Sequence, residues 1–149
     1  MRCCSALQQA LQQALQQALT TTPMKIQPDR FDVPSISGYG VDWVSIAAEK
    51  ITSSVVIGSR GQRADWNCKT FADLTAAHFD TLSQLAPEIV IFGSGSRIRF
   101  PQPEWLKALY AKRIGLETMD MQAACRTYNI LAGEGRDVVL ALLIEQPNT

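Results

Sequence analysis

The feature that most constrains the fold is the segment at residues 88–93 (EIVIFG), in which an unbroken apolar run follows Glu88. Such a segment, without polar alternation, is typical of a strand that is buried on both faces. A helix pattern over residues 103–113 follows and opens with Pro103 in its first turn, and residues 115–119 (GLETM) form the next short strand pattern. Strand, helix and strand in this order predict a parallel β-α-β unit. We therefore expect an α/β domain built in layers.

Short β-rich segments precede this unit. Residues 31–59 alternate strand-like segments with glycine- and serine-rich breaks, which predicts antiparallel strands or hairpins, and a further strand is expected at residues 63–66. Residues 75–86 then place apolar side chains on one helical face, with Thr75 as the N-cap and Pro87 as the stop signal. The N-terminal part of the domain is therefore predicted to add an antiparallel strand system to the parallel unit.

A helix and a strand are predicted in residues 119–145 (MDMQAACRTYNILAGEGRDVVLALLIE). Asp120 is a favourable N-cap, and apolar residues up to position 132 recur at helical spacing. Gly133 is expected as the C-cap because glycine often ends helices. The run RDVVLALLIE then predicts another strand that is buried on both faces.

Length and charge exclude several classes of partner. A chain of 149 residues fits one globular core. It carries 14 basic and 14 acidic side chains, so its net charge of zero gives no electrostatic basis for binding nucleic acid. No segment approaches the roughly 20 apolar residues needed to span a bilayer, so we expect no membrane insertion.

The cysteines and the single histidine argue against a metal site. Cys3, Cys4, Cys68 and Cys125 contain no C-x-x-C pair, and His78 is the only histidine. We therefore predict no metal and no cofactor, and we regard an enzyme as the less favoured class. Cysteine usage suggests a reducing compartment, the cytoplasm of a bacterial cell.

The first 23 residues differ from the rest of the chain. They repeat A-L-Q-Q with a period of four, which winds the leucines around a helix instead of holding them on one face. Paired glutamines also interrupt any apolar core of a signal peptide. We predict a low-complexity, disordered tail at residues 1–23 and a single domain at residues 24–149.

The glycine loop after the buried strand is the first candidate site. Gly93, Ser94 and Gly95 follow the strand, and Arg97 and Arg99 lie just beyond them. Backbone N–H groups of such a loop can bind a phosphate or a carboxylate. The spacing matches neither a dinucleotide fingerprint nor a P-loop. A small-anion site and a simple tight turn both remain open.

The second candidate is the helix that begins at Asp120. Cys125 lies in its apolar stripe, which fits either a small core residue or a reactive thiol at a pocket. Arg126 and Asn129 share a flank of the helix, where they can bind an anion or a partner's carboxylate if they face the glycine loop. Glu134 and Arg136 surround the following turn, where a mutual ion pair or a hydrogen bond that fixes the loop is expected.

The segments EIVIFGSGS and GLETMDMQAACRTYNILAGEGRDVVLALLI resemble the Mth938-like family, also called the DUF498 domain. The resemblance spans residues 36–144 and implies a three-layer α/β domain with a central mixed sheet. The family includes the mitochondrial assembly factor 3 of complex I, so the resemblance implies a protein partner among respiratory-complex assembly components. It implies no established reaction or cofactor. One departure is Met121, where the family pattern carries threonine.

Two hypotheses follow from these observations. The first is a non-catalytic interaction protein, such as an assembly or maturation factor for a respiratory complex. The second is a small-anion or metabolite-binding protein, or an enzyme, that uses a cleft between the glycine loop at 93–95 and the helix start at Asp120. A filled surface at this position favours the first, and an open cleft with a reactive group favours the second.

Overall fold

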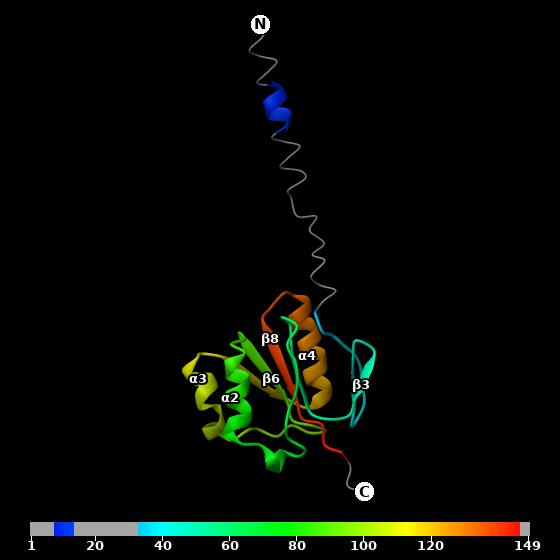
Figure 1. The fold of residues 1–149 in the computed structure, drawn as a ribbon, viewed down its shortest axis with the longest axis vertical. Helices are drawn as coiled ribbons and strands as arrows, with labels where there is room; N and C mark the ends of the chain where they lie inside the picture. Colours follow the sequence, from blue (N-terminus) through cyan, green and yellow to red (C-terminus); the bar gives the residue numbers. More distant parts are fainter. Residues whose placement is uncertain (1–7, 14–32, 147–149) are drawn as a thin grey trace. The chain divides into compact units, whose positions relative to one another are not determined.

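The computed structural model describes residues 8–13 and 33–146. The chain divides into two units, Met1–Phe31 and Asp32–Thr149, and the second holds the sheets and helices considered below (Figure 1). Residues 8–13 are helical, whereas most of the predicted tail and the predicted domain start near Met24 lie outside the described residues. Within those described ranges, no helix is long and apolar enough to cross a membrane.

A five-stranded mixed sheet forms the centre of the domain, in the order β5-β4-β8-β6-β7. The strands are β4 (Val55–Gly58), β5 (Arg63–Asp65), β6 (Ile89–Gly93), β7 (Gly115–Met119) and β8 (Val138–Leu142). β6 pairs in parallel with both β7 and β8, and β4 pairs antiparallel with β5 and β8. The predicted β-α-β unit is therefore confirmed, and all five residues of β8 are buried, as its continuous apolar run predicted.

Helices cover both faces of this sheet (Figure 1). One face packs against α2 (Ala76–Gln84) and α3 (Lys107–Ala111), and Phe79, Leu82 and Leu109 fill that core. The other face packs against α4 (Met121–Gly133), whose buried stripe includes Ala124, Cys125 and Tyr128. The layers are those of the predicted α/β architecture.

A second, smaller sheet joins the core on the α4 side. β1 (Ile36–Tyr39), β2 (Val44–Ile46) and β3 (Glu49–Ile51) form an antiparallel meander in that order. Apolar residues of these strands belong to the same hydrophobic cluster as α4 and β8. Within the strand-like region predicted at residues 31–59, β3 and β4 follow each other closely but belong to different sheets. Ser54 lies between them: its hydroxyl accepts the Ile144 N–H at 3.0 Å and its carbonyl accepts the Trp66 N–H at 3.0 Å.

Two predicted helix ends differ from the structure. The helix expected over residues 103–113 starts as a 3-10 turn at Pro103–Leu106 and ends at Ala111, and Arg113 adopts a left-handed conformation with φ +57°. Gly133 is still helical, and Gly135 is the residue with positive φ (+82°). Its N–H donates to the Ala132 carbonyl, while the next N–H reaches the Leu131 carbonyl, so the helix ends in a Schellman motif displaced by two residues.

The turn between β2 and β3 is strained. Ile46 pairs with Glu49, so Ala47 and Ala48 alone make the two-residue loop, and their φ angles are +50° and +67°. Positive φ angles at both residues match a type I′ hairpin turn, for which asparagine and glycine are the favoured residues. Alanine carries a steric penalty of about 1–2 kcal/mol in this region. Both side chains are exposed, so no packing contact compensates for it.

We predict that the double change Ala47→Asn and Ala48→Gly raises the free energy of unfolding by about 1 kcal/mol, because it relieves this strain. Urea denaturation followed by circular dichroism measures the change. Ala77→Gly is the matched control: Ala77 is exposed and helical, so the same loss of a methyl group should lower stability there. A destabilised turn variant would contradict the strain argument.

Candidate functional site

The glycine loop and the start of α4 lie together at the carboxyl ends of β6 and β7. Gly93 is the register partner of Met119, and the Ser94 N–H donates to the Met119 carbonyl at 2.9 Å. A Cβ atom on Gly93 would lie 2.6 Å from the Leu142 side chain and 3.1 Å from the Ala124 Cβ. A side chain at position 93 would therefore have to displace the side chains of Leu142 and Ala124, which favours glycine here.

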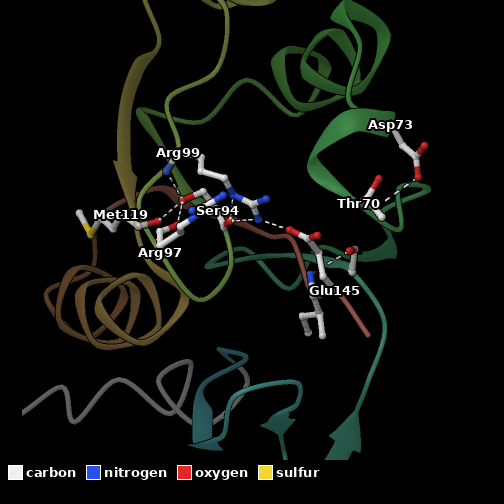
Figure 2. Close-up of polar contacts among 9 residues, drawn as sticks. Thr70, Asp73, Ser94, Arg97, Arg99, Met119 and Glu145 are labelled. Atoms are coloured by element: carbon white, nitrogen blue, oxygen red, sulfur yellow. Dashed lines mark hydrogen bonds and ion pairs between the residues drawn. The ribbon is translucent and has the colours of Figure 1, made fainter. Parts of the chain in front are cut away.

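Ser94 and Arg99 form a hydrogen-bonded network at this edge of the sheet (Figure 2). Ser94 is fully buried, and its hydroxyl donates to the Arg97 carbonyl at 2.7 Å and accepts the Arg99 N–H at 2.8 Å. The Arg99 guanidinium donates to the Ser94 carbonyl at 2.6 Å, pairs with the Glu145 carboxylate and lies 4.9 Å from the centre of the Phe71 ring. The network fixes the path of the loop.

Two N–H groups at the N-terminus of α4 bind acceptors within the protein. The Asp120 carboxylate accepts the Ala123 N–H at 2.9 Å, which confirms the predicted N-cap. The Met121 N–H donates to the Gly95 carbonyl at 2.7 Å. The loop therefore presents the Gly95 carbonyl oxygen to the helix start. A carbonyl oxygen repels an anion, so this contact does not favour the small-anion cleft that was predicted between the two segments.

A hollow of about 550 Å³ lies on the outer side of this loop. Its lining comes from the glycine loop, the β1–β2 turn and the segment after β8, namely Val41, Asp42, Gly95, Ser96, Arg97, Arg99, Glu145 and Gln146. The two arginines face two carboxylates across it, and Arg99 is already paired with Glu145. Its charges are therefore balanced, which offers an anion no excess of positive charge.

Cys125 is a core residue. It is fully buried, and burial raises the pKa of its thiol to about 12. Asp120 raises the same pKa further, whereas Arg126 lowers it. At neutral pH the thiolate, which is the reactive form, is almost absent. The two interpretations left open by the sequence are thus decided in favour of packing.

Asn129 joins α4 to the small sheet. Its side-chain oxygen accepts the Ile36 N–H at 2.9 Å, and its side-chain nitrogen donates to the Ile36 carbonyl at 2.9 Å. The neighbouring Tyr128 hydroxyl donates to the Pro34 carbonyl at 2.7 Å. The side-chain amide thus pairs with both backbone groups of Ile36, as a residue of a neighbouring strand would. This corrects the expectation that Asn129 faces the glycine loop to bind an anion.

Arg126 and Arg136 also differ from expectation. Arg126 is exposed, and its guanidinium lies 3.4 Å from the Tyr39 hydroxyl. Arg136 pairs with Glu88, not with Glu134, and this ion pair raises the pKa of the guanidinium. In the same turn, the Ser59 hydroxyl donates to the Arg136 backbone carbonyl at 2.8 Å.

Sequence reasoning missed Glu145 and gave Arg99 only a general role. The sequence nevertheless contained a pattern that could have predicted an ion pair between these two residues. Glu145 is the one acidic residue that closes the apolar run of β8, and β8 runs parallel to β6. Parallel strands end at the same edge, so a carboxylate after β8 and an arginine after β6 were candidates for an ion pair.

We predict that Asp120→Ala lowers the free energy of unfolding by about 1 kcal/mol, whereas Asp120→Asn costs little, because asparagine is also a competent N-cap. Thermal denaturation of the three proteins measures the difference. If Asp120→Asn destabilises as much as Asp120→Ala, the carboxylate charge matters beyond the capping hydrogen bond.

We also predict that Asn129→Ala costs about 1–3 kcal/mol, because it removes both hydrogen bonds to Ile36 in a partly buried position. Arg126→Ala, one turn earlier and exposed, is the control and should change stability by less than about 0.5 kcal/mol. Urea unfolding gives both values. Equal effects of the two changes would show that the amide does not hold the small sheet.

Comparison with known proteins identifies relatives of this chain. A family model described as "Protein of unknown function (DUF498/DUF598)" matches residues 36–143. NADH dehydrogenase [ubiquinone] 1 alpha subcomplex assembly factor 3 of Bos taurus is 39% identical over 84 residues, which are 55% of this chain and 45% of that protein. The same factor of Xenopus tropicalis is 26% identical over 128 residues, 85% of this chain and 69% of that protein. The chain thus matches about half the length of the bovine relative.

Solved structures agree with this assignment. A crystal structure of a Bordetella parapertussis protein is 36% identical, with a TM-score of 0.72, and the match covers 76% of this chain and 97% of that one. A solution structure of a Mth938-like domain from Bordetella pertussis is 29% identical, with a TM-score of 0.70 over 78% of this chain and 89% of that one. The chain therefore belongs to the Mth938-like (DUF498) family, which includes complex I assembly factor 3.

Proposed function

We propose that this protein is a non-catalytic interaction protein that acts in the assembly or maturation of a respiratory complex. The observation that carries the proposal is its similarity to proteins named as assembly factors of NADH dehydrogenase. We place its partners among the assembly components of that complex and, in a bacterial cell, we expect the protein in the cytoplasm. This role requires a binding surface and no reaction chemistry.

The geometry of the candidate site supports a binding role over an enzymatic one. Asp120 caps a helix, the Cys125 thiol keeps its proton in the core, and Asn129 holds the small sheet. Among the described residues, no group of histidine, cysteine or acidic side chains is arranged to hold a metal ion. Asp120, Asn129 and Arg136 of the family signature are thus engaged in structural contacts, which favours exposed residues outside them for binding.

The rim of the hollow beside the glycine loop is the surface we assign to the partner. Val41, which lines the hollow, is 76% exposed, and Ile98 and Phe100, which alternate with the lining residues Arg97 and Arg99 along the chain, are 52% and 74% exposed. Exposed large apolar side chains are the groups that protein-binding surfaces commonly use as anchors. Arg97 is exposed beside them and adds a donor for a carboxylate of the partner. We call these four residues the rim surface.

We predict that the pair Ile98→Ser and Phe100→Ser reduces recovery of NADH dehydrogenase subunits and assembly proteins with the tagged protein by about tenfold, since exposed apolar anchors typically contribute most to binding. Affinity purification from the native cells, followed by quantitative mass spectrometry, measures the recovery. Because both side chains are exposed, the melting temperature should stay unchanged.

Ile130→Ser provides the matched control. Ile130 is 61% exposed on α4, outside the loop that carries Ile98 and Phe100, so its replacement should leave recovery intact. If the unaltered protein enriches no component of the complex, the proposed role fails. If it enriches them and the rim variants do so equally well, only the assigned surface fails.

A further inference from the structure

Among the residues that the structure describes, the strand β5 is an open edge of the central sheet. It lies at one end of the strand order β5-β4-β8-β6-β7, and all three of its residues, Arg63, Ala64 and Asp65, are exposed. Edge strands present unpaired backbone groups to which another strand can bind. The question is which strand fits this edge.

The hydrogen-bond pattern shows which residues of β5 point outward. The Gly58 N–H donates to the Gln62 carbonyl at 2.8 Å, and the Trp66 N–H donates to the Ser54 carbonyl at 3.0 Å. In an antiparallel ladder, hydrogen-bonded pairs alternate, so Ala64 lies between these two as the bonded partner of Val56. The backbone groups of Arg63 and Asp65 therefore turn away from β4 and face the open edge.

The side chains of this edge are complementary to themselves. Arg63 and Asp65 carry opposite charges at equal distances on either side of Ala64. If a second β5 approaches antiparallel with the two alanines opposite each other, Arg63 of each copy meets Asp65 of the other. Arg63 also donates to Glu49 at 2.7 Å, and its guanidinium has donors for a second carboxylate. A strand without this alternation of charge would leave Arg63 and Asp65 unpaired or opposed, whereas a second β5 carries it by identity.

The same arrangement covers an apolar hollow. On the face of the sheet that carries α2, a hollow of about 490 Å³ lies between β5 and the helix, with Val56, Ala64, Trp66, Leu82 and Leu85 in its lining. Pairing about Ala64 keeps the same faces of both sheets together, so the two hollows meet across the pair of alanines. Side chains along α2, such as Thr81, then lie beside the second copy.

We propose that a second copy of this chain binds at β5, antiparallel and with a twofold axis at Ala64, so that the two central sheets become one continuous sheet. Reciprocal bonds between the backbones of Arg63 and Asp65 form the ladder, and the two Arg63–Asp65 pairs fix the register. This inference is independent of the proposed function, because it concerns a different edge of the domain from the rim surface.

Analytical ultracentrifugation of the full chain over a series of concentrations tests this interface. The unaltered chain should dimerise. Arg63→Asp places carboxylates opposite carboxylates, and Asp65→Arg places guanidinium groups opposite each other, so each single change should raise the dimer Kd by at least about tenfold. The double change Arg63→Asp with Asp65→Arg restores complementarity and should return the Kd to that of the unaltered chain.

An equimolar mixture of the two single variants is the decisive arm. Each is expected to be monomeric alone, yet in the mixture every acidic side chain of one variant meets a basic side chain of the other, so a heterodimer should form. Thermal denaturation of each variant checks that it is folded. A chain that stays monomeric at all concentrations, a dimer unaffected by the single changes, or a mixture that does not associate would each overturn the proposal.

Discussion

The close approach of α4 to the ends of β6 and β8 is the constraint on which the rest of the domain depends. Gly93 has no side chain, and a Cβ atom there would lie 2.6 Å from Leu142 and 3.1 Å from Ala124. This contact brings the Met121 N–H to the Gly95 carbonyl. A hydrogen bond therefore links the glycine loop after β6 to the start of α4, at the edge of the sheet where many α/β proteins bind a ligand.

The helix that packs at this contact also organises the second sheet. One stripe of α4 fills the core against β8, while Asn129 and Tyr128 bind the backbone of Ile36 and Pro34. A side-chain amide can donate and accept at once, so it pairs with both backbone groups of one strand residue. The small sheet thus gains polar contacts to the helix in addition to shared apolar packing.

The sequence predicted what depends on local pattern. Continuous apolar runs identified β6 and β8, and Asp120 identified the start of α4. It did not predict the contacts of Asn129, because the partner, Ile36, is 93 positions away and is recognised through its backbone, which leaves no trace in residue type. The two-residue shift at the end of α4 had a different cause, since Gly133 and Gly135 both satisfy the general preference for glycine and only the fold selects one.

Asp120 and Asn129 of the family signature make structural contacts. These contacts affect which residues remain available to bind a partner. A polar side chain that caps a helix or pairs with a backbone has fewer donor or acceptor sites left for a partner, and breaking its contact costs about 1–3 kcal/mol. A partner therefore binds at a lower free-energy cost to residues without such contacts. The exposed side chains of Val41, Ile98 and Phe100 meet this condition. The loop that carries Ile98 and Phe100 is fixed by the Ser94–Arg99–Glu145 network, so little conformational entropy is lost when a partner binds there. Under the proposed function, the signature builds the platform and the exposed loops carry the recognition.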